Sequence, residues 1–277
     1  MRFSIVTPSF RSSKWLKLCI SSVADQGVEL EHTVQDAVSD DGTLDWLLLE
    51  KRVNVCVEKD QGMYDAVNRG LKKSSGEICA YLNCDEQYLP GALASVEEFF
   101  ERNPDIEIVF GNAIVVDSQG EFLCHRKSLL PLKPHTKISS NLAILTCGTF
   151  FRRSVFEKRG LWFNPKMRAL GDADWLIRCL EQNVPMGLLD TFTSVFTNTG
   201  KNLSLNADAQ RENANLLSAA SPWLRASRPL IIAHHRLRKW MKGGYRQKPF
   251  DYSIYTADSP GKRVSFHVAR PVARWVR

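Results

Sequence analysis

The chain lacks any long apolar run. Eighteen consecutive apolar residues occur nowhere, and the apolar stretches at residues 141–151 and 230–233 are far shorter than a membrane-spanning helix requires. The apolar segment at residues 3–6 stops at Pro8, which makes it too short for the hydrophobic region of a signal peptide. We therefore expect a cytoplasmic protein whose contact with any membrane is peripheral.

Paired cysteines are lacking as well. The cysteines are odd in number and contain no C-x-x-C pair, at positions 19, 56, 79, 84, 124, 147 and 179. This pattern is typical of reduced thiols and argues against a disulfide framework or structural zinc. Internal repeats and low-complexity segments are also missing. With 277 residues, 44% hydrophobic and 24% charged, the chain is long enough for a large folded domain with an appendage.

Positive charge is concentrated at one end of the chain. Residues 221–277 contain thirteen Lys or Arg and two acids, a local charge of +11, whereas the first 220 residues carry −4. Trp223 and Trp240 lie among these cations, which suits a bilayer interface, and a second Trp-bearing basic cluster follows Pro271, a residue acceptable early in a helix. Three interpretations remain open: a helix bound to an anionic membrane, a helical subdomain packed on the main domain, or, least favoured, a nucleic-acid surface.

Strand-like and helix-like segments alternate through the first half of the chain, which predicts an α/β fold with a largely parallel sheet. The expected strands are residues 3–7, 31–36, 53–58 and 78–82, and the expected helices are residues 13–24, 44–50, 64–73 and 90–102. A hairpin at residues 106–125, a helix at 173–182, an extended segment at 186–196 and a mostly helical remainder complete the prediction.

Acidic side chains follow three of the expected strands. Asp36 ends the second strand, Asp60 follows the third, and the pair Asp85 and Glu86 follows the fourth. Because the carboxyl ends of parallel strands open on one crevice, these carboxylates should converge there. A divalent ion such as Mg²⁺ or Mn²⁺ would relieve their repulsion by taking one or two carboxylates together with phosphate oxygens. The ordinary alternative is that these acids cap helices or form turns.

The order and spacing of several short motifs resemble the inverting glycosyltransferases of family two, which have the GT-A fold. The motifs are SIVTPSF at 4–10, QD at 35–36, SDDGT at 39–43, EKDQGMYDAVNRG at 58–70, YLNCDE at 81–86, GTFFRR at 148–153 and ALGDADWLIR at 169–178. The segment from Gly62 to Gly70 is similar to the branch found in bacterial polysaccharide assembly. The resemblance covers residues 3–196 and implies a Rossmann-like GT-A domain at 1–204, divided into a nucleotide-sugar half (1–110) and an acceptor half (111–204). The basic tail, 205–277, lies outside it.

The resemblance also implies roles for individual residues on the donor side. Thr7, Pro8 and Ser9 would line the base and ribose, and Asp36 would accept the N–H of uracil, a donor that suits a carboxylate. The remaining donor-side residues would contact the ribose, the sugar or the diphosphate, and they are Asp60, Asp65 and Asn83. Asp85 would bind the metal that bridges the diphosphate, and Glu86 would support that ion directly or through water.

Asp172 is the expected catalytic base. Inverting transfer needs one carboxylate that takes the proton of the acceptor hydroxyl as its oxygen attacks the anomeric carbon. Asp174 is the alternative base, although either acid could simply cap the helix that starts here. Trp175 is expected on the acceptor side as a platform for a sugar ring, with a core position as the equal alternative.

Three positions depart from the family pattern. Glu86 stands where Asp is more frequent, Cys147 where relatives often have His, and Val67 where other branches have an Arg near the nucleotide. The cation for the diphosphate is therefore expected from one of three arginines, Arg152, Arg153 or Arg178.

The sequence thus predicts a metal-dependent inverting hexosyl- or N-acetylhexosaminyl-transferase. Its donor would be a nucleotide diphosphate sugar, in the first place a UDP-sugar, its cofactor Mn²⁺ or Mg²⁺, and its acceptor a hydroxyl of a glycan or polyprenyl-linked glycolipid. Such an acceptor suits a peripheral enzyme held at an anionic membrane by residues 221–277. The alternatives are a non-catalytic scaffold on the same fold and a sugar nucleotidyltransferase, which the absence of a glycine-rich basic loop after the first strand disfavours.

Overall fold

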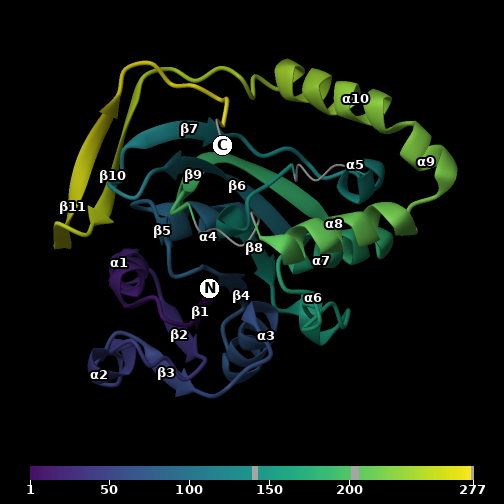
Figure 1. The fold of residues 1–277 in the computed structure, drawn as a ribbon. Helices are drawn as coiled ribbons and strands as arrows, with labels where there is room; N and C mark the ends of the chain where they lie inside the picture. Colours follow the sequence, from purple (N-terminus) through teal and green to yellow (C-terminus); the bar gives the residue numbers. More distant parts are fainter. Residues whose placement is uncertain (139–142, 201–205, 276–277) are drawn as a thin grey trace.

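The computed structural model describes residues 1–138, 143–200 and 206–275, and its centre is a large sheet with helices packed on both faces (Figure 1). Within these residues nine strands form that sheet, in the order β3-β2-β1-β4-β8-β6-β9-β5, and β7 pairs with β6 beside this path. A separate two-stranded sheet, β10-β11, lies near the carboxyl end of the chain.

The first half of the sheet is parallel, as the sequence predicts. Its strands are β1 (Phe3–Ser9), β2 (Leu30–Asp36), β3 (Asn54–Val57) and β4 (Ile78–Tyr81), and β1 lies between β2 and β4. The helices that connect them are α1 (Ser13–Ala24), α2 (Thr43–Leu47) and α3 (Met63–Lys73). Because all four strands run in one direction, their carboxyl ends lie along the same edge of the sheet.

The second half of the sheet is mixed. It consists of β5 (Glu86–Tyr88), β6 (Ile108–Val116), β7 (Phe122–Arg126), β8 (Thr149–Arg152) and β9 (Met186–Thr197). The predicted hairpin is confirmed as β6 and β7, which pair antiparallel. Every residue of β6 is buried, since β6 pairs with β7, β8 and β9 and is covered on both faces. The helices of this half are α4 (Ala92–Arg102), α5 (Lys133–Ile138), α6 (Ser154–Glu157) and α7 (Gly171–Glu181).

Side chains that alternate along the strands build two hydrophobic layers. On β1, Val6 faces a cluster formed with α3 and α7, whereas Phe3 and Ile5 face a cluster formed with α1 and α4. The same division holds on β4, where Cys79 and Tyr81 belong to the first cluster, and Ile78 and Ala80 to the second. This alternation follows from the two-residue period of a strand and fixes which helix covers which face.

The tail differs from its prediction. Residues 207–241 form three helices, which are α8 (Ala207–Ala219), α9 (Pro222–Ala226) and α10 (Arg228–Met241). The expected helix in the last part of the chain is wrong, because β10 (Phe250–Thr256) and β11 (Ser259–Val268) form an antiparallel hairpin and residues 269–275 contain no helix. Among the described helices, none combines the length and the apolar character that a membrane crossing demands.

The hairpin packs on the main sheet. Tyr252 and Ile254 join a buried cluster with Ile114 and Val195 of the sheet. The guanidinium of Arg263 donates to both carboxylate oxygens of Asp25, at 2.6 and 2.7 Å. The carboxyl end of the chain is thereby attached to α1 and to the edge of the sheet, which Figure 1 shows at the left of the molecule.

Candidate functional site

Asp36 ends β2 and is completely buried. One carboxylate oxygen accepts from the backbone N–H of Ser39 at 2.7 Å, and the other accepts from the hydroxyls of Ser9 (2.7 Å) and Ser39 (2.8 Å). A carboxylate has about four acceptor positions, so three are used within the protein. Asp36 therefore fixes the end of β1 and the following turn, and these three contacts leave one of its acceptor positions unused.

Of the two β1 residues before Ser9, Thr7 is buried in the core and Pro8 is half-buried. The hydroxyl of Thr7 lies 2.8 Å from Nε2 of His32, and both side chains are buried. Burial lowers the pKa of His32 to about 3, so its ring is neutral at neutral pH. Pro8 is half-buried, and its carbonyl accepts from the thiol of Cys84. The side chain of Thr7 thus serves the core.

Asp60 and Asp65 flank the turn that leads from β3 into α3. Asp60 accepts from the N–H of Gly62 at 2.8 Å, and burial raises the pKa of its carboxyl. Asp65 is held by Arg69, whose Nη2 lies 2.9 Å away, and by the N–H of Gln61 at 3.0 Å. Burial raises the pKa of Asp65, but these contacts outweigh it and the net shift is downward. Of the two acids, Asp65 is the one already engaged in an ion pair.

The turn after β4 brings Asn83, Asp85 and Glu86 together. Glu86 is completely buried at the start of β5, and its Oε2 accepts from the N–H of Asn83 at 2.9 Å. In this structure Oε1 of Glu86 and Oδ1 of Asn83 are buried without a hydrogen-bond partner. Burial raises the pKa of Glu86 to about 8, with the charge of Asp85 adding to it, and burial raises the pKa of Asp85 to about 6.

These two carboxyls suit a hard divalent cation. Bare oxygen atoms in a buried position are costly unless a donor or a cation meets them. Mg²⁺ is commonly held by one or two carboxylates plus substrate phosphates, so two protein oxygens suffice. Within the described residues no group of three or more His, Cys, Asp or Glu forms a complete metal site. The donor set therefore fits an ion that substrate oxygens help to bind.

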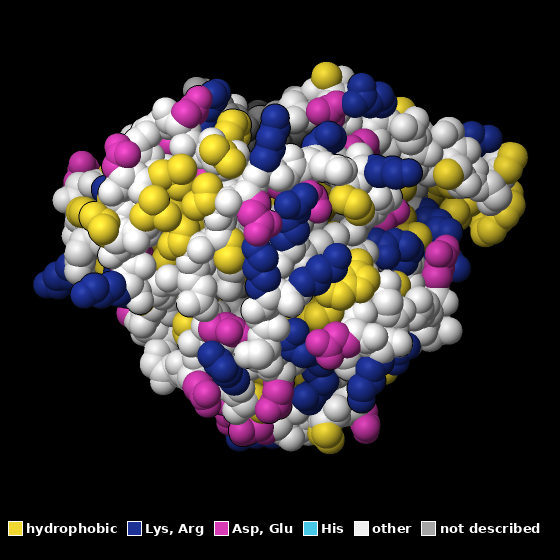
Figure 2. Space-filling model, turned by 90° about the horizontal axis from the view of Figure 1, so that it is seen from below, with side chains coloured by type: hydrophobic (Ala, Val, Ile, Leu, Met, Phe, Trp, Pro, Cys, Tyr) yellow, Lys and Arg dark blue, Asp and Glu magenta, His cyan; other side chains and the backbone are white. Residues whose placement is uncertain are grey.

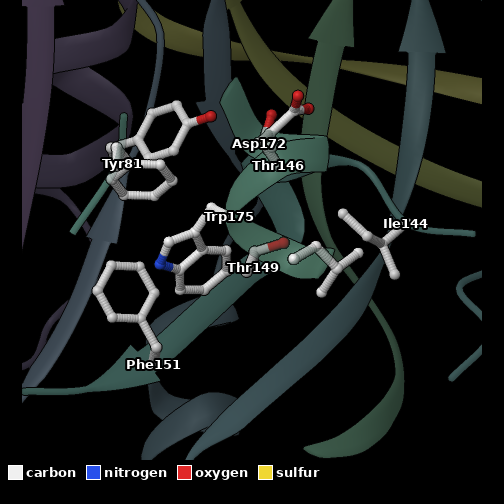
Figure 3. A pocket seen from close by; sticks show the side chains of 9 residues that line it. Tyr81, Ile144, Thr146, Thr149, Phe151, Asp172 and Trp175 are labelled. Carbon is white, nitrogen blue, oxygen red and sulfur yellow. The ribbon is translucent and has the colours of Figure 1, made fainter. Parts of the chain in front are cut away.

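Asp172 is the second residue of α7, at the rim of a small pocket. Its Oδ1 accepts from the N–H of Ala173 at 2.8 Å, and the hydroxyl of Tyr64 lies 3.5 Å away. Burial raises the pKa of Asp172 to about 6, which leaves a carboxylate that binds a proton more readily than usual. Figure 3 shows this carboxylate at the same end of the pocket as the hydroxyl of Tyr81.

Aromatic rings also line the pocket. They are Phe151, Phe163 and Trp175, and Trp175 stacks on Phe163 at 5.0 Å between ring centroids. Figure 3 shows Phe151 and Trp175 side by side. Trp175 is 3% exposed and donates its indole N–H to the carbonyl of Leu161 at 2.7 Å. The volume open to water inside the pocket is about 10 Å³, roughly the space of one water molecule. Trp175 is thus a core residue under the site, and a sugar ring does not fit on it in this conformation.

Asp174 has a different environment from Asp172. Its carboxylate is 2.9 Å from the guanidinium of Arg178, one helical turn further along α7. This ion pair lies outside the pocket, whose lining includes Asp172 but not Asp174. The structure therefore separates the two acids into one at the pocket and one engaged on the helix surface.

The expected cations lie in the wrong places. Arg152 donates to the carbonyls of Ile106 (2.9 Å) and Phe100 (2.8 Å), and Arg153 donates to the carbonyl of Gly76 at 2.6 Å. Because β8 runs antiparallel to β4, these arginines lie at the amino end of β4, opposite the acids. The expectation that Arg152 or Arg153 contacts a diphosphate is wrong for this reason.

A different arginine lies over the turn that follows Asp60. Nη1 of Arg168 lies directly over Gly62, only 2.5 Å from where a Cβ on that glycine would be. Gly62 also has a φ of 126°, which other residues rarely adopt. The glycine therefore makes room for an exposed cation next to Asp60, and the sequence motifs carry no signal for it because Arg168 precedes the matched acceptor segment.

Sequence reasoning also missed Glu212 of α8. Its carboxylate, 7% exposed, accepts three successive backbone N–H groups, from Arg168 (2.6 Å), Ala169 (3.0 Å) and Leu170 (2.8 Å). These residues lead directly into α7 and Asp172. Glu212 thus fixes the loop that carries both the cation near Gly62 and the candidate base. A contact across more than forty residues leaves no local pattern in the sequence.

Close packing joins this loop to the donor half. A Cβ on Gly171 would lie 2.6 Å from the ring of Tyr64, so only glycine permits the approach of α7 to α3. The hydroxyl of Tyr64 also donates to the carbonyl of Ala169 at 3.2 Å. Through these contacts Asp172 faces the half of the domain that carries Asp60 and Asp85.

Known proteins resemble this chain in sequence and in fold. Residues 4–160 match the family described as Glycosyl transferase family 2. A PGL/p-HBAD biosynthesis glycosyltransferase of Mycobacterium bovis is 30% identical over 188 residues, which cover 64% of this chain and 69% of that protein. A GalNAc(5)-diNAcBac-PP-undecaprenol beta-1,3-glucosyltransferase of Campylobacter jejuni is 30% identical over 166 residues, covering 57% of this chain and 52% of that protein.

Solved structures agree in fold. TarS 1-349 of S. aureus in complex with UDP-GlcNAc matches with a TM-score of 0.61 and 18% identity, over 87% of this chain and 73% of that chain. The mannosyltransferase PcManGT of Pyrobaculum calidifontis, in complex with GDP-Man and Mn²⁺, matches with a TM-score of 0.55 and 16% identity, over 85% of this chain and 75% of that chain. The predicted GT-A fold is confirmed by these likenesses. Together with the sequence matches they establish that the chain belongs to glycosyl transferase family 2, whose members are nucleotide-sugar glycosyltransferases.

Proposed function

We propose that the protein is a metal-dependent inverting hexosyl- or N-acetylhexosaminyl-transferase that uses a UDP-sugar. The acceptor we propose is a hydroxyl group of a glycan or a lipid-linked glycan. The observation that carries this proposal is Asp172, a buried carboxylate with a raised pKa that lines the pocket and whose charge adds to the burial that raises the pKa of Glu86. A UDP-GlcNAc complex of TarS and the undecaprenol-linked acceptor in the name of the Campylobacter relative support the choice of substrates.

In this proposal Asp172 takes the proton of the acceptor hydroxyl. The hydroxyl oxygen then forms a bond to the anomeric carbon while the bond from that carbon to the diphosphate breaks, and the diphosphate leaves with the electron pair. The Ala173 N–H on Oδ1 orients the carboxylate, and its pKa of about 6 leaves it ionised and basic at neutral pH. Asp174 stays the less favoured base because Arg178 engages it.

The donor side would hold the nucleotide and its metal. We assign the uracil N–H to the remaining acceptor position of Asp36, the ribose and diphosphate surroundings to Ser9, Asp60, Asp65 and Asn83, and the diphosphate charge in part to Arg168. Asp85 and Glu86 would hold Mn²⁺ or Mg²⁺, and the Mn²⁺ in the PcManGT complex supports this choice. When bound, such an ion neutralises the charge that develops on the leaving diphosphate.

We further propose that residues 1–204 carry the transfer chemistry and that the basic segment from residue 221 onward holds the enzyme at an anionic membrane surface. A lipid-linked acceptor would be presented there, on the cytoplasmic face in our proposal. The support is the charge of the segment and its Trp residues, two of which, Trp223 and Trp240, are exposed.

Nucleotide-dependent thermal stabilisation tests the donor proposal. UDP, GDP, dTDP and CMP are each added with Mn²⁺, Mg²⁺ or EDTA to the wild type, to Asp85→Ala and to Asp105→Ala, an exposed acid far from the site as control. A ligand that binds the native state raises the melting temperature. We expect UDP with metal to stabilise the wild type and the control but not Asp85→Ala. Stabilisation by none of the nucleotides would favour a non-catalytic scaffold.

A further inference from the structure

Helix α10 exposes an apolar stripe, unlike an ordinary surface helix. Five of its apolar residues recur at helical spacing along one face, which we name the outer face: Leu230, Ala233, Leu237, Trp240 and Met241. All five are exposed, and the four large side chains have exposed fractions of 74, 52, 63 and 69% in that order. A surface helix normally turns such a stripe toward the core and its charges toward water.

The face of α10 that packs on the domain is mixed and includes charged side chains. Lys239 is 8% exposed and lies over the ring of Tyr245 at 4.9 Å, and burial lowers the pKa of its ammonium to about 8. Arg238 donates to the carbonyl of Leu130 at 2.9 Å, and Ile231 packs in a cluster with Leu224 of α9. Burial of a lysine is costly, yet these contacts bury Lys239 together with Ile231 and leave the outer face exposed.

The segment that carries the outer face is purely basic. Residues 213–250 contain no Asp or Glu, and they contain eight cations: Arg225, Arg228, Arg236, Arg238, Lys239, Lys242, Arg246 and Lys248. The opposite side of the molecule differs, since Figure 2 shows Lys and Arg side chains interspersed with Asp and Glu over the face that carries α2 and α3. The apolar stripe and the one-signed charge therefore coincide at α9 and α10.

From this coincidence we propose that the outer face of α10 docks in the plane of an anionic lipid bilayer. Leu, Met and Trp side chains suit the boundary between headgroups and acyl chains, and the flanking cations suit anionic headgroups. A helix of 14 residues is too short to span the bilayer but long enough to lie on it. A nucleic acid would bind the cations but would not use the apolar side chains of the outer face. This inference rests on the membrane attachment proposed above and narrows it to one face of one helix. It assigns no membrane contact to β10 and β11.

The test is co-sedimentation of the full chain with vesicles. Two compositions are compared, pure phosphatidylcholine and phosphatidylcholine with about one third phosphatidylglycerol, at low and high salt. The key variant is Leu237→Glu combined with Trp240→Glu. Its matched control is Leu48→Glu combined with Leu49→Glu, whose leucines are 63 and 78% exposed but lie near α2. Because all four side chains are exposed, the folds should be intact, and melting temperatures with UDP and Mn²⁺ verify this.

We expect the wild type and the control to bind anionic vesicles in a salt-dependent manner, and the α10 variant to bind at least about tenfold more weakly. Arg236→Gln with Lys242→Gln should weaken binding to anionic vesicles only. Equal binding of the α10 variant and the control would overturn the proposal, as would a wild type that does not sediment with either vesicle. A dimer that the α10 variant dissociates, without vesicle binding, would assign the face to a second copy. Vesicle binding is independent of nucleotide stabilisation, so failure of this inference and failure of the donor proposal are distinguishable.

Discussion

Replacement of Glu212 by Gln tests how the loop before α7 contributes to stability and to catalysis. The carboxylate accepts three N–H groups, with one oxygen serving Arg168 and the other serving Ala169 and Leu170. The amide of Gln has one oxygen, so it can retain two of these bonds while its NH₂ group faces the third N–H. An N–H that loses its acceptor costs about 1–3 kcal/mol, and bonds to a neutral acceptor are about half as strong as those to a charged one.

Burial of the neutral amide is less costly than burial of the carboxylate, which offsets part of this loss. We therefore expect the Glu212→Gln variant to lose about 2 kcal/mol in the free energy of unfolding, a urea midpoint lower by on the order of 0.5–1 M. Amide hydrogen exchange at residues 168–170 should accelerate. Asp208→Asn is the control, because Asp208 lies on the same helix and forms an ion pair with exposed Arg211, and its effect should stay within about 0.5 kcal/mol.

The same variant should alter catalysis without altering nucleotide binding. A displaced loop misplaces Asp172, and a misplacement of about 1 Å can cost about a hundredfold in rate, so kcat should fall about ten- to a hundredfold. The charge of Glu212 raises the pKa of Asp172, so its removal should move the acid limb of the rate profile to lower pH. UDP affinity, measured by calorimetry, should stay within about twofold. Unchanged stability, exchange and kcat together would refute the positioning role.

Three further changes test other parts of the molecule. The Asp172→Asn variant should have a kcat lower by about a thousandfold, while UDP should still raise its melting temperature. In the wild type the rate should fall as the pH drops through about 6. A wild-type rate that does not depend on pH between 5 and 8 would contradict the assignment of Asp172 as the base. Because the raised pKa means that the folded state resists ionisation of this carboxyl, the Asn variant should gain stability over the wild type above pH 6 and lose that gain toward pH 4 in urea titrations. Gly171→Ala should cost about 1–3 kcal/mol in the free energy of unfolding, since its Cβ meets an aromatic ring, whereas Gly261→Ala, with open space around it, should cost far less; equal effects would show that the close approach is unimportant. Arg263→Gln should cost about 1–2 kcal/mol because its partly exposed ion pair with Asp25 anchors the hairpin, and a urea midpoint equal to that of Lys262→Gln would disprove this anchoring.

The sequence predicts the parallel half of the fold well. Its strands are short apolar runs, and acids at their ends must meet because parallel strands share one edge, so Asp36 and Asp85 could be placed in advance. Packing contacts between residues far apart in the chain could not be predicted from the sequence. Glu212 occupies an amphipathic helix where an acid ordinarily faces water, and only the fold brings it to the loop before α7.

Two errors have local physical causes. Phe250, Tyr252 and Ile254 alternate with other residues at the two-residue period of a strand, a signal that the basic composition of the tail obscured. Arg152 belongs to the GTFFRR motif at residues 148–153 and is one of the cations that we expect at the diphosphate. The antiparallel direction of β8 carries it to the far edge of the sheet, and strand direction cannot be read from spacing.

The two attachments of the tail limit how it can move. Before α9 the chain is held where α8 meets the loop at residues 168–170, and after α10 it is held by the hairpin on the sheet and on Asp25. The intervening segment is therefore a strap fixed at both ends instead of a free tether. A surface that binds α10 sets the tilt of the whole catalytic domain, and with it the height of Asp172 above that surface. An enzyme mounted in this way would select acceptors by the distance of their hydroxyl from the lipid as well as by the identity of the sugar.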